Sequence, residues 1–477
     1  MTTRPICARL REDVLLEVVY DDRTPFGSGF TGLNDRLLQR SCEPLRKAVA
    51  ADGWPSVLAR AEDWMRRIMA PQALGALYRK PGELRETCLY PPAHDVRPAA
   101  LRIAVPRGDR HATTIVALTE PLLGSLARWL GDWQRGASRP RAPHAAALWD
   151  RLEALGAFET PRPAVSALAD GVTFIGHATV AVQAQGSQLL FDPYLVPPSS
   201  ADPPQLRPHT PCDLRPTAIF ITHSHHDHFD VDTLLRFPAD TPIYVPPVAR
   251  ESLLATDMAL RLRQLGFTRV RELEWGGEVH DGPFCIRALP FYGEQPTDGR
   301  PLHPEARNVG NTYVVEGLGR SIALVADAGR DAAGSTIEMA AEARRRHGPL
   351  DVLFGGFRAW RIQPIRFIGT SVARYVLFVP PGECTRVQQI MNDAEDFVAT
   401  GQAWGARAIV PYANGGAPWF ARVGLGPHGT VDNPDDDDFD PSLDEVRRAM
   451  AAAAPTDVAL QVMTTGQCSH AFEAGPA

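Results

Sequence analysis

Hydrophobic side chains recur with a helical period in the first third of the chain. Residues 56–69 and 120–134 carry Leu, Trp, Ile or Met at every third or fourth position, and residues 145–155 form a similar segment. Residues 102–105 and 113–117 are short apolar runs of the kind that form strands. These patterns predict a region of mixed helices and strands at the start of the chain.

After a proline-rich stretch at residues 158–163, the pattern changes to short β-branched runs separated by turn residues and helical segments. The strand-like runs are 172–175, 179–182, 188–191, 218–222, 242–245, 284–289, 312–315, 322–325, 352–354 and 408–410, and the helical segments are 231–236, 337–346 and 387–404. This alternation predicts a layered α/β domain. We therefore expect an N-terminal α+β domain over residues 1–165 and a second domain over residues 166–477.

Composition and charge are those of an ordinary globular protein. Hydrophobic residues make up 44% and charged residues 22%, and no apolar run approaches the roughly 20 residues of a membrane span. The formal net charge of -7 argues against a general nucleic-acid binder. The seven cysteines form no CxxC pair, which argues against a zinc ribbon or a disulfide framework. Residues 1–13 show no apolar core followed by a cleavage site of small residues, so we expect a cytoplasmic protein.

The chemistry is concentrated in residues 219–230, Ile-Phe-Ile-Thr-His-Ser-His-His-Asp-His-Phe-Asp. Five metal-capable side chains follow an apolar run within six residues. Imidazole and carboxylate are the usual ligands of zinc, iron and manganese. A single histidine would more often be a surface or hydrogen-bonding residue. The spacing of His223, His225, Asp227 and His228 instead predicts two metal ions about 3.5–4 Å apart, with the first two residues on one ion and the last two on the other.

This loop resembles the HxHxDH motif of the metallo-β-lactamase superfamily. Residues 174–180, Phe-Ile-Gly-His-Ala-Thr-Val, and residues 189–194, Leu-Leu-Phe-Asp-Pro-Tyr, resemble the first strands of its lactonase-like and phospholipase-D-like branch. The resemblance covers roughly residues 170–415. It implies an α/β fold, the metallo-β-lactamase αββα sandwich, preceded here by the N-terminal α+β domain.

The same resemblance implies roles for residues outside the loop. Asp192 would lie beside the metals and orient a ligating imidazole. His177 would line the pocket in a supporting role, or be structural. Asp327, in a turn that resembles the superfamily's "GDTG" turn, would bridge the two metals. His226 occupies the unconstrained position of the motif, and we expect it to be exposed or to support a ligand.

The sequence departs from the family at two places. Hydrolytic members carry a further histidine after the strand predicted at 284–289, but residues 290–297 contain none. Glu294 is the charged metal-capable residue there, and we expect it to be a ligand rather than a surface residue. Near the end of the domain, Ala413 stands where the family has the histidine of a "PxHWGT" segment.

A nearby family histidine is likewise replaced, by Met391. The second metal would therefore keep an open position or take a ligand from elsewhere in the chain. His347 and His428 are the nearest alternatives, and the pattern favours neither.

Exchanging an imidazole for a carboxylate lowers the Lewis acidity of zinc and stabilises higher-valent iron. The pattern resembles the diiron oxygenase branch of the chloramphenicol-pathway β-hydroxylase type, which has a glutamate at this place and an N-terminal domain. The resemblance implies a non-heme diiron monooxygenase with two iron ions and dioxygen as co-substrate, in which Glu294 and Asp327 are catalytic. Such an enzyme hydroxylates an unactivated C–H bond in natural-product (antibiotic) biosynthesis.

The resemblance also implies a small-molecule or carrier-tethered substrate, an electron-donor protein and a homodimer, without nucleic acid or membrane. The alternative is a zinc- or manganese-dependent metallo-hydrolase of the lactonase or phosphodiesterase kind, acting through a bridging hydroxide. The absence of the third histidine and the alanine at 413 argue against it. A third reading, a binding protein that has kept the fold, does not explain the intact metal loop.

Two further features have weaker interpretations. Residues 148–156 resemble the last helix of a winged-helix-like unit, so dimerisation or partner docking is our expectation for the N-terminal domain. Arg358, Arg361 and Arg366 lie near Trp360 in the sequence. They would meet an anionic substrate or a carrier's phosphopantetheine, or form a surface cluster without function.

Overall fold

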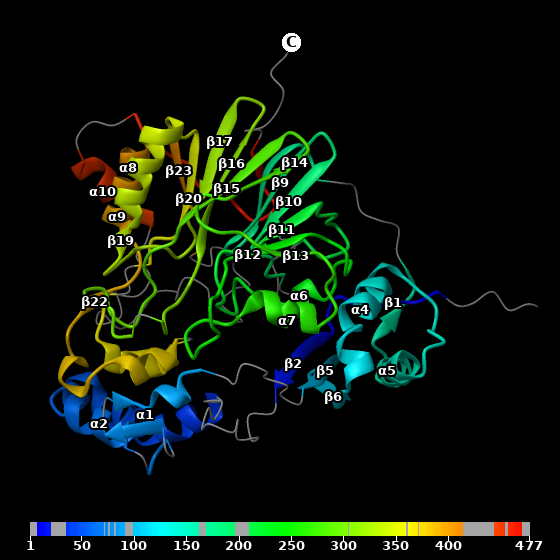
Figure 1. Cartoon of the computed structure of the whole chain (residues 1–477), viewed down its shortest axis with the longest axis horizontal. Helices are drawn as coiled ribbons and strands as arrows, with labels where there is room; N and C mark the ends of the chain where they lie inside the picture. Colours follow the sequence, from blue (N-terminus) through cyan, green and yellow to red (C-terminus); the bar gives the residue numbers. More distant parts are fainter. Residues whose placement is uncertain are drawn as a thin grey trace, which may run out of the picture.

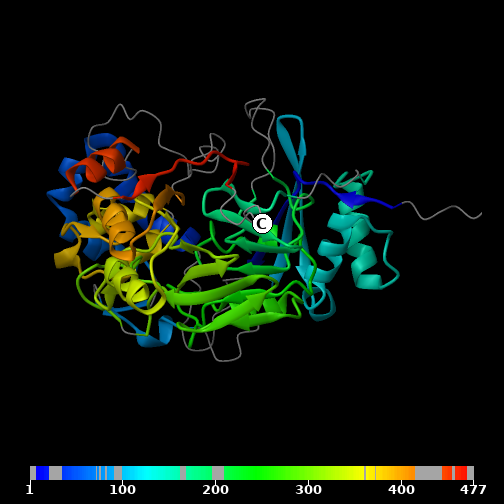
Figure 2. The ribbon, with the colours of Figure 1, turned by 90° about the horizontal axis from the view of Figure 1, so that it is seen from above.

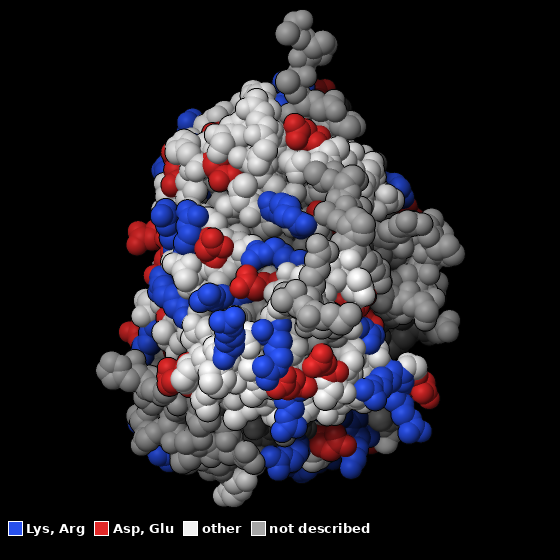
Figure 3. Space-filling view, turned by 90° about the vertical axis from the view of Figure 1, so that its right-hand side faces the viewer, with Lys and Arg blue, Asp and Glu red and all other residues white. Residues whose placement is uncertain are grey.

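Two mixed β-sheets of seven strands each lie face to face at the centre of this computed structural model (Figure 1). The structure describes residues 7–20, 35–70, 72–74, 77–80, 83–90, 99–161, 168–195, 209–303, 305–358, 361–370, 372–413, 443–453 and 457–469. None of the described helices is long and apolar enough to cross a bilayer. On the face shown in Figure 3, basic and acidic side chains are interspersed.

The first sheet begins as an antiparallel meander and continues with parallel strands. In spatial order it contains β13 (Val270–Glu272), β12 (Ile243–Val245), β11 (Ala218–Phe220), β10 (Ser187–Phe191), β9 (Thr179–Ala184), β8 (Gly171–Gly176) and β25 (Cys468–Ser469). Strands β8 and β10 are buried along their whole length, as their continuous apolar runs predict. The C-terminal strand β25 pairs antiparallel with β8 and lies at the edge of this sheet.

The second sheet also changes from antiparallel to parallel pairing, at β17. It contains β14 (Glu278–Asp281), β15 (Phe284–Pro290), β16 (Asn311–Gly317), β17 (Arg320–Leu324), β20 (Val352–Gly355), β23 (Ala408–Pro411) and β24 (Ala459–Leu460). Aromatic side chains of both sheets fill the space between them. Phe220 of the first sheet, for example, packs edge-to-face on Tyr313 of the second at 5.4 Å between ring centroids.

Helices cover the outer faces of the two sheets, so the predicted αββα sandwich is confirmed. Helices α6 (Val231–Leu234) and α7 (Met258–Gln264) share a core with the first sheet. Helices α8 (Thr336–His347), α9 (Ala394–Trp404) and α10 (Leu443–Ala452) cover the second sheet. The helix predicted over 387–404 begins only at α9, because the side chain of Asp393 caps it by accepting a hydrogen bond from the Asp396 amide.

The N-terminal residues form two groups that lie at opposite ends of the molecule (Figures 1 and 2). One group packs against the late segments η3 (Pro364–Gly369), η4 (Ala373–Phe378) and η5 (Pro381–Glu383). Its elements are α1 (Asp35–Leu58), α2 (Ala61–Ile68), β3 (Tyr78–Lys80), β4 (Glu83–Leu84) and η2 (Glu86–Cys88). The helix predicted over 56–69 is therefore divided between α1 and α2.

The other group packs beneath α6 and α7 of the first sheet. Its elements are β1 (Arg9–Leu10), β2 (Leu15–Tyr20), β5 (Ala99–Arg107), β6 (Arg110–Leu118), α3 (Glu120–Leu123), α4 (Leu126–Arg135), α5 (Pro143–Ala154) and β7 (Phe158–Glu159). The N-terminal part contains helices and strands, as predicted, but its two groups belong to different hydrophobic cores. The predicted boundary between residues 165 and 166 lies outside the described residues and stays a prediction.

The contact between α4 and the segment that joins α6 to β12 leaves no room for a side chain at Gly131. A Cβ atom there would lie 2.3 Å from the carbonyl oxygen of Phe237. We expect Gly131→Ala to lower the free energy of unfolding by about 1–3 kcal/mol, because overpacking outweighs the gain in helix propensity. Urea unfolding followed by circular dichroism measures the change. Gly369→Ala, where a Cβ atom would meet nothing within 4 Å, is the control; equal stability of both variants would contradict this packing.

Candidate metal centre

The loop 221–230 is held at both ends, so its side chains have fixed directions. At its start, the Asn311 amide donates to the Thr222 carbonyl over 2.7 Å, and His223 forms a β-bridge with Gly310. Inside the loop, the amides of His228 and Phe229 both donate to the His225 carbonyl. At its end, the Asp230 carboxylate caps α6. The loop therefore turns four candidate ligands toward one region.

Left-handed backbone conformations mark the strand ends around this loop. Of the seven described non-glycine residues with positive φ, five lie here. They are His177 (φ 48°), Asp192 (φ 41°), Glu294 (φ 50°), Ala326 (φ 47°) and Ala413 (φ 61°). An L-residue in this region costs of order 1–3 kcal/mol, and such strain clusters at functional sites. The strained turns end the strands sharply and aim side chains of both sheets at one centre.

The first group of candidate ligands is His223, His225 and Glu294, which the structure brings together as predicted. The Glu294 Oε2 atom lies 3.0 Å from His223 Nε2 and 2.8 Å from His225 Nδ1. These three donor atoms lie within 4.8 Å of one another. His223 is fully buried and Glu294 is 2% exposed, whereas His225 retains some exposure. Asn308 Nδ2 also donates a hydrogen bond to the Glu294 Oε2 atom, over 3.3 Å.

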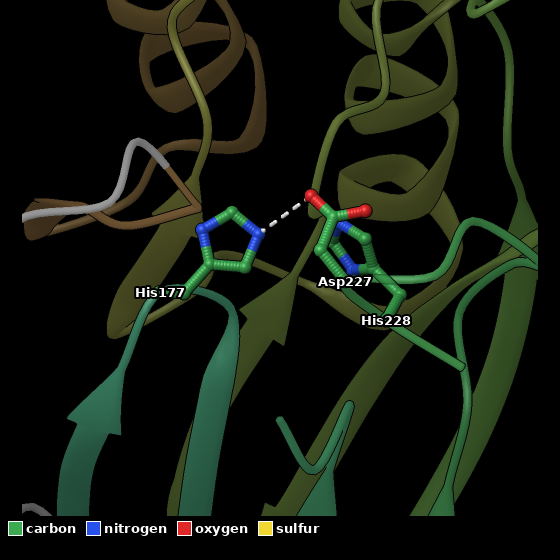
Figure 4. Close-up of side chains that lie close together, drawn as sticks. All are labelled: His177, Asp227 and His228. Carbon is green, nitrogen blue, oxygen red and sulfur yellow. Dashed lines mark hydrogen bonds and ion pairs between the residues drawn. The ribbon is translucent and has the colours of Figure 1, made fainter. Parts of the chain in front are cut away.

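The second group contains Asp227 and His228, which are consecutive in the metal loop, and His177, which faces Asp227 from the turn between β8 and β9 (Figure 4). The Asp227 Oδ2 atom lies 3.0 Å from His177 Nε2 and 4.0 Å from His228 Nε2. Asp327 lies between the two groups, because its Oδ2 atom is 3.3 Å from His228 Nε2 and its carboxylate also forms a ligand-like triplet with His223 and His228. The bridging position predicted for Asp327 therefore fits the geometry.

Asp192 is hydrogen-bonded to His228, so it can orient that imidazole, and its role beside a metal stays a prediction. Its Oδ2 atom accepts a hydrogen bond from His228 Nδ1 over 2.8 Å, which leaves Nε2 directed toward Asp327. Both Asp192 oxygens are also held by Thr222, whose amide and hydroxyl donate over 2.7 and 2.6 Å. A hydrogen bond at the far nitrogen sets the tautomer and direction of a ligating imidazole.

Tyr375 performs the corresponding task for His225, and nothing in the sequence pattern indicated it. Its hydroxyl lies 3.2 Å from His225 Nε2 and donates to the Glu294 carbonyl over 2.5 Å. Because that donation uses the hydroxyl proton, the oxygen is the acceptor for His225 Nε2–H. This leaves Nδ1 of His225 as the donor atom that faces Glu294. Tyr375 belongs to η4, which is 150 residues away along the chain.

The charges of the site fit a bound cation. Burial would raise the pKa of the Glu294 and Asp227 carboxyls, but the neighbouring imidazoles outweigh it and lower both pKa values. Burial would lower the pKa of His228, but Asp327, Asp192 and Asp227 raise it. The raised pKa values of His225 and His228 favour protons on these two imidazoles, which would balance the buried carboxylates in the metal-free chain. Metal ions would displace those protons and supply the same charge.

An unsatisfied atom supports the same fit. The Oδ1 atom of Asp327 is buried and has no hydrogen-bond partner among the described residues. Gly356 lies beside this oxygen: a Cβ atom there would be 3.5 Å from Asp327 Oδ1 and only 2.8 Å from the Ala326 carbonyl oxygen, so a side chain would not fit without a shift. A buried carboxylate oxygen without a donor is costly unless a cation binds it. The imidazole and carboxylate donors present here suit zinc, iron or manganese.

The remaining sequence candidates lie elsewhere. His226 is exposed, as expected, and Met391 is buried in the core beside η3 and η4. His347 ends α8 near Arg287 and does not belong to the metal-capable groups of the described residues. His428 and Trp360 lie outside the described residues.

The three arginines near position 360 do not form a surface cluster. Arg361 forms an ion pair with Asp393, and Arg366 is buried with its guanidinium 5.0 Å from the ring centroid of Trp54. Arg358 is also buried, at 7% exposure. These contacts are intramolecular, so the role in binding an anionic substrate stays a prediction.

A cavity of about 220 Å³ is lined in part by the residues that follow Glu294 in the sequence. Its lining includes Gln295 and Thr297 on one side and Phe378 of η4 on the other. Arg300 and Arg307 also line it, and Arg307 forms an ion pair with Asp331 over 2.8 Å. The cavity therefore combines apolar walls with two arginines, each paired with a carboxylate, Arg300 with Glu383 and Arg307 with Asp331.

Comparison with known proteins agrees with the fold. Residues 188–403 match the model of the beta-lactamase superfamily domain. The chain is 31% identical over 217 residues to the 4-amino-L-phenylalanyl-[CmlP-peptidyl-carrier-protein] 3-hydroxylase of Streptomyces venezuelae. That alignment covers 44% of this chain and 39% of the relative, so it spans well under half of the relative's length. The chain is also 32% identical over 123 residues to a UPF0173 metal-dependent hydrolase of Ligilactobacillus salivarius, covering 25% of this chain and 48% of the hydrolase.

A solved structure extends the likeness to nearly the whole chain. The crystal structure of CmlA, a diiron beta-hydroxylase from Streptomyces venezuelae, superposes with a TM-score of 0.58 and 20% identity. The match covers 96% of this chain and 99% of that one. At this identity the likeness shows the fold, and it includes the segments that precede the sandwich.

The contact of Tyr375 with His225 gives a test of the first group. We expect Tyr375→Phe to weaken metal binding by about 10–100-fold, because His225 loses the acceptor that holds its orientation. Competition with a chromophoric chelator measures the affinity. Tyr292→Phe is the matched control, since that ring packs edge-to-face on Trp275 instead. Equal affinities in the two variants would remove Tyr375 from the site.

Proposed function

We propose that this chain, whose residues 188–403 form a beta-lactamase superfamily domain, is a non-heme diiron hydroxylase that acts on an unactivated C–H bond in natural-product biosynthesis. One iron would be held by His223, His225 and Glu294. The other would be held by residues that include Asp227 and His228, and Asp327 would bridge them. Homodimerisation and a protein electron donor remain predictions.

The observation that carries the proposal is the position of Glu294. Its carboxylate lies within 3.0 Å of both His223 and His225, where hydrolytic relatives carry a third imidazole. Two histidines and one carboxylate on a single ion, with positions left open, are typical of non-heme iron oxygenases. A zinc hydrolase obtains its nucleophile by lowering the pKa of a zinc-bound water. An added carboxylate ligand makes the ion less electrophilic and weakens this effect.

The residues of the chain would bind, orient and shield the reacting groups. Two iron ions bound here would supply the activation of dioxygen and the oxidation of the C–H bond. Asp192 and Tyr375 keep the far nitrogens of His228 and His225 occupied, so that their other nitrogens face the metals. The exposures of Glu294 and Asp327, at 2% and 4%, keep bulk water away from the carboxylates.

The cavity beside Glu294 is our candidate for the substrate site. The relative from Streptomyces venezuelae is named for hydroxylating an amino acid carried on a peptidyl carrier protein. We extend that substrate class to this chain, with the reacting carbon near the first iron and the tether directed outward. A panel of carrier proteins loaded with different aminoacyl groups, with product mass as the readout, tests this assignment.

A metallo-hydrolase is the second candidate, favoured by the similarity to the UPF0173 metal-dependent hydrolase. The two functions differ in their metal. We expect the chain expressed in iron-supplemented medium, and purified without added metal, to contain about two irons per chain, with an oxo-bridged near-ultraviolet absorption. Elemental analysis with an optical spectrum decides. Zinc or manganese without that absorption would favour the hydrolase, to be followed by an ester and phosphodiester panel.

Glu294 gives a sharper test within one chain. We expect Glu294→His to shift the metal content from iron toward zinc and to abolish oxygen-dependent hydroxylation, because a third neutral imidazole restores the softer, more electrophilic site. Metal content and product mass are measured side by side. Glu305→His is the control, because Glu305 is exposed and does not belong to the metal-capable groups of the described residues. An unchanged metal preference in Glu294→His would exclude Glu294 from the site.

A further inference from the structure

We propose that His177 is a direct ligand of the second metal ion and replaces the histidine that is absent at position 413. This inference rests on the two-metal centre of the proposed function, but not on the metal being iron or on any reaction with dioxygen. It changes the role expected for His177 from a pocket-lining, supporting residue to one that binds metal.

The position of the imidazole supports metal binding. His177 Nε2 lies 3.0 Å from Asp227 Oδ2, and the donor atoms of His177, Asp227 and His228 all lie within 4.8 Å of one another. Two ligands with bonds of about 2.1 Å, at right angles on one ion, have donor atoms about 3 Å apart. Figure 4 shows His177 facing Asp227 from a separate segment, with His228 next to Asp227 in the metal loop. All three are buried, and His177 and His228 are fully so.

The backbone explains how His177 can replace a ligand from another strand. The Ala413 amide donates to the His177 carbonyl over 3.0 Å, so the two residues are neighbours although 236 positions separate them. Both have positive φ, at 48° and 61°, and follow the ends of β8 and β23. Ala413 is fully buried and offers only a methyl group. His177 therefore lies next to position 413, and its imidazole can supply a ligand that a histidine at 413 would otherwise supply.

The consequence is a matched pair of ligand sets. His223, His225 and Glu294 would hold one ion, and His177, His228 and Asp227 the other. Each set contains two imidazoles and one carboxylate, with Asp327 between them. The second ion would thereby have the same donor types as the first, which a set of Asp227 and His228 alone lacks.

The competing role for His177 is to hold Asp227 by a hydrogen bond without touching the metal. Glutamine at 177 separates the two roles, because its amide nitrogen can take the place of His177 Nε2 and still donate toward Asp227, but it is a poor ligand for a transition metal. A ligand role predicts that His177→Ala and His177→Gln lose the same metal. A supporting role predicts that His177→Gln keeps it.

The test is titration of the metal-free full-length chain with Co²⁺, followed by visible absorption and by metal counting after gel filtration. We expect two equivalents for the wild type. We expect His177→Ala and His177→Gln to bind the first equivalent normally and the second at least about 100-fold more weakly, a loss larger than the roughly 10–100-fold typical of removing a residue that only supports a ligand. The retained first equivalent shows that the variants are folded. His347→Ala, which removes an imidazole outside the site, should bind two equivalents.

Returning the ligand to its family position gives a second readout. In His177→Ala/Ala413→His we expect the second Co²⁺ equivalent to be recovered, because the two positions are adjacent. Two tight equivalents in His177→Ala, or wild-type binding in His177→Gln, would overturn the proposal. Two Co²⁺ equivalents with the expected losses, in a chain whose native metal proves to be zinc, would refute the diiron function and leave the His177 assignment standing. A wild type that binds fewer than two equivalents would refute both.

Discussion

Buried carboxylates at one end of the sandwich impose the constraint on which the rest of the site depends. Asp192, Asp227, Glu294 and Asp327 are each less than 10% exposed and lie close together. Burying several negative charges is costly unless cations pair with them. Imidazoles surround these groups, and the carboxylates raise the pKa of His228 and His225. The cluster is thus built for positive charge, which protons supply in the metal-free chain and metal ions would supply in the loaded one.

The fold meets this constraint by ending strands of both sheets at one place. β8, β10 and β11 come from the first sheet, and β15, β17 and β23 from the second. Several of these strand ends are followed by a residue with positive φ, which turns the chain abruptly. The strain energy of those turns is offset by the packing of the two sheets against each other and against their helices. A flexible loop could not hold so many charged groups at distances near 3 Å.

The N-terminal elements contribute to the site indirectly. Tyr375, which orients His225, belongs to η4, and η4 shares its hydrophobic core with α1 and α2. The Tyr78 hydroxyl also donates to the Leu377 carbonyl over 3.3 Å. The first helices of the chain therefore brace a residue that touches the metal loop. This gives the N-terminal region a structural role in the site, in addition to the docking or dimerisation predicted for it.

The sequence by itself determined the features that depend on neighbouring residues. The HxHxDH spacing, the apolar strand before it, and the positions of Glu294 and Asp327 after later strands predicted both the sandwich and most of the candidate site. Asp192 was also expected, because residues 189–194 resemble the corresponding strand of the superfamily branch. Only the tertiary structure decided which distant segments meet. Tyr375 reaches His225 from 150 residues away, His177 reaches Asp227 from 50 residues away, and the N-terminal part divides between two cores. Hydrophobic periodicity indicates which face of a helix or strand is buried, but not which other element covers that face. The positions of these residues depend on that packing between distant elements, so the sequence pattern could not predict them.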